Sequence, residues 1–213
     1  MQRARHLLRS SLVVIVLFGL SKAVGLVRAR LVAGAFGAGM EYDAFTAANQ
    51  LPELFFAVIA GGSLAAALIP VYSQYLAQES RDASTRLANT ILTLVLLVLG
   101  SVSAVGILLA PWLTRHVLVP DFPPEQQLLT AQIMRVILLQ TTLFGFSGAL
   151  GSLLNAHQHF ALPALAPLSL DIGYFIGIFL LVPRLGVIGL AWGTVVGALF
   201  HLLIQVPALR RYR

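Results

Sequence analysis

Long apolar runs separated by short polar stretches dominate the hydropathy pattern of this chain. Residues 54–78, 87–113, 136–154 and 185–209 carry no charged side chain, and residues 160–183 carry only Asp171. A membrane-spanning helix needs about 20 mostly apolar residues, and these runs reach that length. Apolar and polar positions do not alternate within them, so the pattern predicts helices that cross a membrane.

The pattern predicts six such helices in one all-α unit. The expected helices cover about residues 10–34, 42–76, 86–113, 127–154, 160–183 and 186–209. The breaks between them contain turn-forming residues, as in Phe36-Gly37-Ala38-Gly39 and Pro183-Arg184-Leu185-Gly186. We therefore expect an all-α polytopic membrane protein whose residues 1–213 form a single transmembrane lobe.

The composition agrees with a membrane protein and excludes several other classes. The apolar fraction is 58% and the charged fraction is 10%, against about 45–50% and about 25% in an average soluble domain. This excludes a soluble globular domain and a disordered tail. The chain has no cysteine, which excludes disulfides, zinc-thiolate sites and a cysteine nucleophile.

The net charge of +6 is placed where a membrane protein carries it, so we expect no nucleic-acid partner. With six spans, both termini and the second connection share one side, while Arg115 and Arg184 lie on the other. The shared side holds eight arginines, namely Arg3, Arg5, Arg9, Arg81, Arg86, Arg210, Arg211 and Arg213. The positive-inside rule therefore predicts a cytoplasmic (inner) membrane protein with both termini in the cytoplasm.

The first expected helix contains three cations, Lys22, Arg28 and Arg30. At the bilayer centre each costs about 2.5–3.5 kcal/mol, so some of them must face water, an anion or an acidic partner. A regular helix cannot aim all three in one direction. We expect Lys22 and Arg28 to face an interior cleft and Arg30 to reach the interface. The alternative is that all three lie near interfaces or pair locally with acids that follow the helix.

Four acids accompany the second and fifth helices. Glu41 and Asp43 open the second helix, where carboxylates stabilise a helix N-terminus. Glu53 and Asp171 lie deeper, so each needs a basic partner or a hydrogen-bonded neutral form. Both are candidate cleft acids, and Asp171 is either a cation-responsive group or a neutral acid that joins two helices.

The sequence contains no pattern that predicts an enzyme. A P-loop, a dinucleotide-binding glycine pattern and a nucleophile elbow are missing, and we expect no cofactor. His157 and His159 lack further ligands at metal-binding spacing, so no metal site is expected. Two GxxxG spacings, Gly173–Gly177 and Gly193–Gly197, permit close contact between helices.

A series of short motifs runs along almost the whole chain. They are Ser21-Lys22-Ala23-Val24-Gly25-Leu26-Val27-Arg28, Phe36-Gly37-Ala38-Gly39-Met40, Asp43-Ala44-Phe45, Leu51-Pro52, Ala110-Pro111-Trp112, Leu154-Asn155-Ala156 and Gly189-Leu190-Ala191-Trp192-Gly193. In order and spacing they resemble the MurJ/MviN family, the lipid II flippases of the MOP transporter superfamily.

The resemblance implies a helical flippase with two lobes around a cationic cavity. Its substrate would be an undecaprenyl-diphosphate-linked disaccharide-pentapeptide, moved from the cytoplasmic to the outer leaflet for peptidoglycan synthesis. Basic residues of the family's N-terminal lobe are thought to bind the diphosphate. Their positions correspond here to Lys22 and Arg28, with Asp43 as a nearby functional acid.

The chain also departs from the family pattern. Where the family usually continues with Asn and a pair of arginines after Leu-Pro, this chain has Glu53, and the basic positions read Phe56 and Ala57. Two positions that are usually acidic read Ala29 and Gly61. Several cavity charges are thus replaced, and Glu53 adds a negative one.

The six expected helices correspond to one lobe of the family, whose members have about fourteen helices. The resemblance therefore implies that the second lobe is absent, and that a second copy or a separate second-half chain completes the transporter. Three alternatives stay open from the sequence. They are an accessory or scaffolding protein of envelope synthesis that binds a partner through its glycine faces, an inert truncated remnant, and a MOP-type exporter of another substrate.

Overall fold

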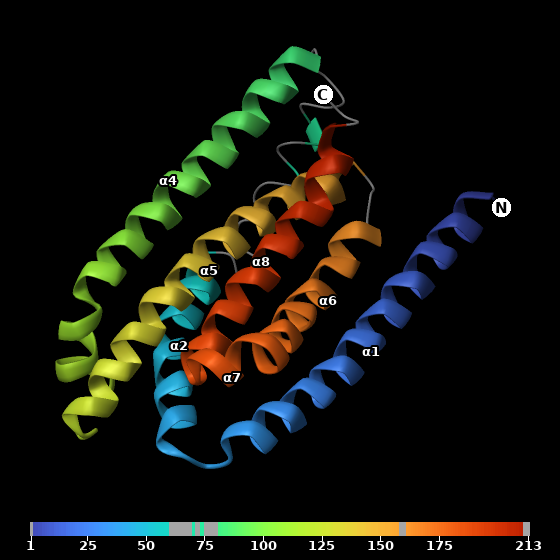
Figure 1. The fold of residues 1–213 in the computed structure, drawn as a ribbon. Helices are drawn as coiled ribbons and strands as arrows, with labels where there is room; N and C mark the ends of the chain where they lie inside the picture. Colours follow the sequence, from blue (N-terminus) through green and yellow to red (C-terminus); the bar gives the residue numbers. More distant parts are fainter. Residues whose placement is uncertain (1, 60–69, 71–72, 75–80, 158–160, 211–213) are drawn as a thin grey trace.

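The computed structural model describes residues 2–59, 70, 73–74, 81–157 and 161–210, and every regular element among them is a helix (Figure 1). The elements are α1 (Gln2–Phe36), α2 (Met40–Ile59), α4 (Arg81–Leu113), the π-helical turn η1 (Thr114–Leu118), α5 (Pro124–Ala156), α6 (Ala161–Ile176), the π-helical turn η2 (Gly177–Leu181), α7 (Val182–Leu185) and α8 (Val187–Arg210). Most of the expected continuation of the second helix, residues 60–76, lies outside the described residues, as does His159.

Within the described part of the chain, four segments are long and apolar enough to cross a membrane. They are Ala83–Leu118, Pro124–Ala156, Leu168–Leu185 and Val187–Pro207. The expectation of an all-α polytopic membrane protein is thereby confirmed, and the count of six helical segments agrees roughly with the structure. The fifth expected segment is divided by η2 into α6 and α7, which the hydropathy pattern did not indicate.

Two of the expected breaks are made by glycines in the left-handed conformation. Gly37 has φ = +58° and its N–H donates to Ala33 O at 2.8 Å, which ends α1. Gly186 also has φ = +58° and separates α7 from α8. Glycine adopts this conformation without the steric cost that a Cβ imposes.

Helix α5 forms the centre of the bundle and packs on α2, α4 and α8. Apolar side chains on several sides of this helix are almost fully buried, including Ile133, Met134, Ile137 and Leu138. A helix that is apolar all round is stable only when neighbours cover it on all sides. The burial of α5 therefore fixes the positions of the helices around it.

Helices α6 and α8 approach closely at their glycines. A Cβ built on Gly173 would lie 2.3 Å from Gly197 Cα, and one built on Gly193 would lie 2.7 Å from Gly177 Cα. Small residues allow such backbone contact between membrane helices. The two GxxxG faces are thus occupied by each other, and they are not free to bind the partner that a scaffolding function requires.

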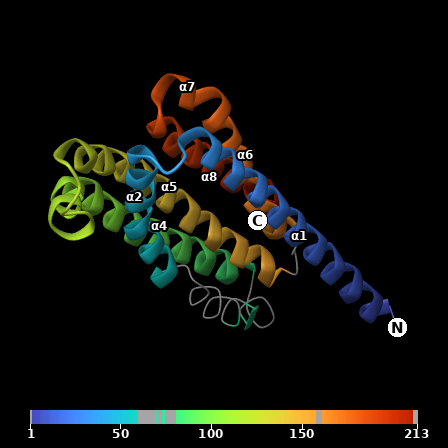
Figure 2. The same cartoon turned by 90° about the horizontal axis from the view of Figure 1, so that it is seen from below.

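Helix α1 lies apart from the rest over its N-terminal half. Figures 1 and 2 show it leaving the bundle, while its C-terminal half packs on α6. Leu26, on this helix, is 74% exposed. Figure 1 also shows that α1 begins and α8 ends at the same end of the bundle, as an even number of crossings requires.

Candidate functional site

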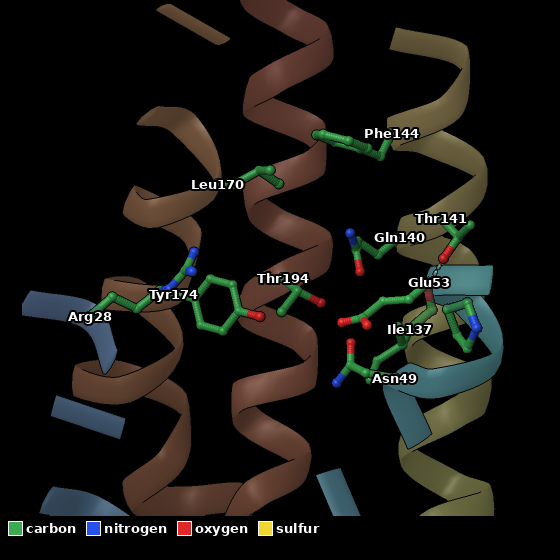
Figure 3. Close-up of a pocket in the computed structure, with 11 residues that line it drawn as sticks. Arg28, Asn49, Glu53, Ile137, Gln140, Thr141, Phe144, Leu170, Tyr174 and Thr194 are labelled. Carbon is green, nitrogen blue, oxygen red and sulfur yellow. Dashed lines mark hydrogen bonds between the residues drawn. The ribbon is translucent and has the colours of Figure 1, made fainter. Parts of the chain in front are cut away.

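A cavity of about 200 Å³ lies where α1, α2, α5, α6 and α8 meet (Figure 3). Uncharged polar side chains make up much of its wall, together with one cation and one carboxylate. The lining residues are Arg28, Asn49, Pro52, Glu53, Ile137, Gln140, Thr141, Phe144, Leu170, Tyr174 and Thr194.

Arg28 reaches this cavity from α1 and forms an ion pair with Asp171 of α6. Its Nη1 donates to Asp171 Oδ1 at 2.7 Å, and the side chains are 34% and 5% exposed respectively. A charge inside a membrane is stabilised most by a close, hydrogen-bonded opposite charge. The acidic partner that the first helix needs is therefore Asp171, and the local pairing with Glu41 or Asp43 is not the arrangement that the structure has for Arg28.

The ring of Tyr174 makes a second contact with the guanidinium. Arg28 Cζ lies 4.5 Å from the centroid of the Tyr174 ring, one turn along α6 from Asp171. A guanidinium has five N–H donors, of which the Asp171 contact uses one. Because a third of the side chain is exposed, the remaining donors can meet an anion that enters the cavity.

Glu53 lines the cavity from α2. In Figure 3 its carboxylate points into the cavity toward Thr194 and Tyr174, with the side chains of Asn49 and Gln140 beside it. Arg28, the cation of this cavity lining, pairs with Asp171 and not with Glu53. The cavity therefore has a charge-neutral ion pair on the side of α1 and α6 and an anionic side at α2, formed by Glu53.

The other two residues expected to bind substrate lie elsewhere. Lys22 and Asp43 are exposed, and neither lines the cavity. Asp43 is in the first turn of α2 together with Glu41, where both carboxylates face the partial positive charge of the helix terminus. The structure thus brings together Arg28, Asp171 and Glu53, but not Lys22 or Asp43.

Charge-based reasoning missed the uncharged part of the site. Asn49, Gln140, Thr141, Tyr174 and Thr194 all line the cavity. One signal was present, because Gln140 and Thr141 are adjacent polar residues in the middle of an uncharged apolar run. Thr194 has no polar residue next to it in its apolar run, so the sequence did not indicate that it lines a cavity.

A second buried polar cluster joins α5 to α8. Ser147 Oγ lies 2.5 Å from His201 Nδ1 and accepts a hydrogen bond from Gln205 Nε2 at 2.9 Å. All three residues are at most 6% exposed, and the Phe144 ring of the cavity wall lies 4.5 Å from the His201 ring. The cluster connects the cavity wall to α8.

In the described part of the chain, no group of three or more His, Cys, Asp or Glu side chains could hold a metal ion.

Comparison with known proteins identifies the family. The family model described as lipid II flippase MurJ matches residues 32–213 of this chain. The chain belongs to the MurJ family. Lipid II flippase MurJ of Burkholderia cenocepacia is 32% identical over 195 residues, which cover 90% of this chain and 38% of that protein. Probable lipid II flippase MurJ of Buchnera aphidicola subsp. Acyrthosiphon pisum is 30% identical over 200 residues, covering 89% of this chain and 38% of that protein.

A solved structure confirms the fold. The structure titled "Lipid II flippase MurJ, inward closed conformation" superposes with a TM-score of 0.80 at 21% identity, and covers 95% of this chain and 42% of that one. This chain therefore spans about two fifths of the length of the MurJ proteins that it matches. The resemblance seen in the sequence is confirmed, and it corresponds to one lobe of those proteins.

Proposed function

We propose that this chain forms the N-terminal lobe of a flippase that moves a polyprenyl-diphosphate-linked peptidoglycan precursor, lipid II, across the cytoplasmic membrane. The observation that carries the proposal is the guanidinium of Arg28 at a cavity within the membrane-spanning bundle. The work would be transport alone, without the making or breaking of a covalent bond, so the chain would not be an enzyme. Membership of the MurJ family supports the same substrate class.

The ion pair suits Arg28 to reversible anion binding. Without ligand, Asp171 neutralises the guanidinium, so Arg28 is not an isolated charge inside the membrane. A diphosphate offers several anionic oxygens that accept paired, charge-assisted hydrogen bonds from the N–H groups left over. Lys22 lies six residues earlier on α1, about 9 Å along the axis, and would contact a more distant part of the same headgroup. Asp43 would act from the start of α2.

The transport cycle would need a second lobe. Alternating access depends on one repeat rocking against another around a shared site. The MurJ proteins matched here are more than twice as long as the matched part. A second copy of this chain, or a separate second-half chain, would supply the opposite wall, and we favour either over action as a lone lobe.

The orientation follows from the arginines of the sequence. With six spans, eight of them belong to the termini and the second connection, against Arg115 and Arg184 in connections of the opposite side. By the positive-inside rule the side with the eight arginines would face the cytoplasm. A lipid-linked precursor made in the cytoplasm would then enter from the side that carries both termini.

Native mass spectrometry in mild detergent tests the proposal. The purified chain is mixed with lipid II, and retention of the lipid is compared for wild type, Arg28→Ala and Arg30→Ala. Arg30 is the matched control, because it lies on the same helix and is exposed outside the cavity lining. We expect Arg28→Ala to weaken retention about tenfold or more, the effect of one lost charge-assisted contact. Equal retention by both variants would contradict the assignment of Arg28.

A further inference from the structure

We propose that the anionic side of the cavity binds a compact monovalent cation, either a sodium ion or a primary ammonium group. The charges around the cavity lead to this inference. Arg28 and Asp171 neutralise each other at 2.7 Å. Arg28 is the cation among the described lining residues, so its pairing with Asp171 leaves the Glu53 carboxylate on the cavity wall without a cation from that lining, and residues 54–78 that follow it in sequence contain no cation.

Two hydroxyl groups of the wall have already used their donors within their own helices. Thr141 Oγ1 donates to Ile137 O at 3.0 Å and Thr194 Oγ1 donates to Ala191 O at 2.7 Å. A hydroxyl has a single hydrogen, so both oxygens can offer only lone pairs to the cavity.

Asn49 likewise offers a free acceptor oxygen to the cavity. One of its two amide hydrogens is taken by Phe45 O at 2.8 Å, while no hydrogen bond among the described residues uses its Oδ1. With Glu53, the wall therefore provides a carboxylate, an amide oxygen and two hydroxyl oxygens. Oxygen acceptors of this kind suit a hard cation or the three N–H donors of an ammonium group.

Charge and size restrict the ligand further. Because Arg28 is neutralised by Asp171, the Glu53 carboxylate balances one positive charge, whereas a divalent ion would leave one positive charge in excess. A volume of about 200 Å³ has room for roughly six water molecules, enough for a partly hydrated ion or a methylammonium group. Glu53 is itself exposed, so a ligand can reach it.

Thermal unfolding of the purified full chain in detergent tests this site without any lipid substrate, so the outcome does not depend on transport. Sodium chloride or methylammonium chloride replaces N-methyl-D-glucamine chloride at constant ionic strength. A ligand that binds only the folded chain raises the unfolding temperature. We expect at least one of the two cations to raise it for wild type. A rise with sodium alone identifies a metal ion, and a rise with methylammonium alone identifies an ammonium site.

Two variants decide whether Glu53 is responsible. Glu53→Gln should abolish the rise, with an apparent dissociation constant at least about tenfold higher. Glu41→Gln, which removes an exposed carboxylate from the first turn of the same helix, should leave the rise intact. An absent rise in wild type, or an equal rise in Glu53→Gln, would overturn the proposal.

A second variant and a second measurement cover the case in which Glu53→Gln does not fold. Thr194→Val keeps the shape of the side chain and removes its oxygen, so it should weaken the cation effect severalfold. In parallel, if sodium raises the unfolding temperature, the sodium-23 NMR line should also broaden in the presence of wild-type chain; if methylammonium alone raises it, the line should stay sharp. A sodium-23 line that disagrees with the unfolding result, or a Thr194→Val response equal to that of wild type, would also refute the site.

Discussion

Replacing Gly173 by alanine should force α6 and α8 apart. The added Cβ would lie 2.3 Å from both Cα and N of Gly197 and 2.4 Å from Gly193 O, whereas ordinary contacts begin at 3.4 Å. The helices would therefore have to separate by about 1 Å. Overpacking costs about 1–3 kcal/mol, and the upper part of that range applies because every atom in the way is backbone and cannot rotate aside.

The free energy of unfolding, measured by denaturant titration in mixed detergent micelles, checks this value against two control variants. Gly100→Ala adds a Cβ with no neighbour within 4 Å among the described residues, so it should be neutral or stabilise by up to about 1 kcal/mol. Gly145→Ala meets only the end of the Leu99 side chain, which can move, and should fall between the two. Equal stability of Gly173→Ala and Gly100→Ala would refute the packing argument.

Three further outcomes follow from the contacts of the site, each measured as the free energy of unfolding. In a double-mutant cycle, Arg28→Ala and Asp171→Ala should be coupled by about 1–3 kcal/mol, and strict additivity would contradict the ion pair. Tyr174→Leu should cost about 0.5–2 kcal/mol more than Tyr174→Phe, because phenylalanine keeps a ring face toward Arg28; no difference between them would exclude a cation–π contribution. Ser147→Ala should cost about 1–3 kcal/mol by leaving His201 and Gln205 without their shared hydroxyl, and an unchanged stability would show that water replaces it.

The apolar runs predicted the helices well because the length and polarity of a membrane helix depend only on consecutive residues of the sequence. The π-helical turns at Thr114–Leu118 and Gly177–Leu181 were not predicted. They insert one residue into a turn without changing the hydropathy, so no local pattern distinguishes them from regular helix. The described part of α2 confirms where its helix begins, with Glu41 and Asp43 in the first turn.

The charges of the site were predictable, but their partners were not. The cost of Arg28 in a membrane required water, an anion or an acidic partner, and Asp171 was a candidate cleft acid, yet 143 residues separate the two. Only the packing of α1 on α6 brings them together. The cavity-lining threonines could not be predicted. A threonine hydroxyl can bond to its own helix, and the sequence does not indicate whether its free lone pairs then face lipid, protein or a cavity.

The distance in sequence between Arg28 and Asp171 also has a consequence in time. A ribosome adds about 5–20 residues per second, so the carboxylate that neutralises Arg28 is synthesised roughly 7–30 s after it. During that interval Arg28 cannot pair with Asp171, because α6 has not yet been made. Helix α1 is therefore made well before the helix that supplies its ion-pair partner, and the charge of Arg28 has to be stabilised by water, lipid headgroups or the translocation machinery until α6 has been inserted.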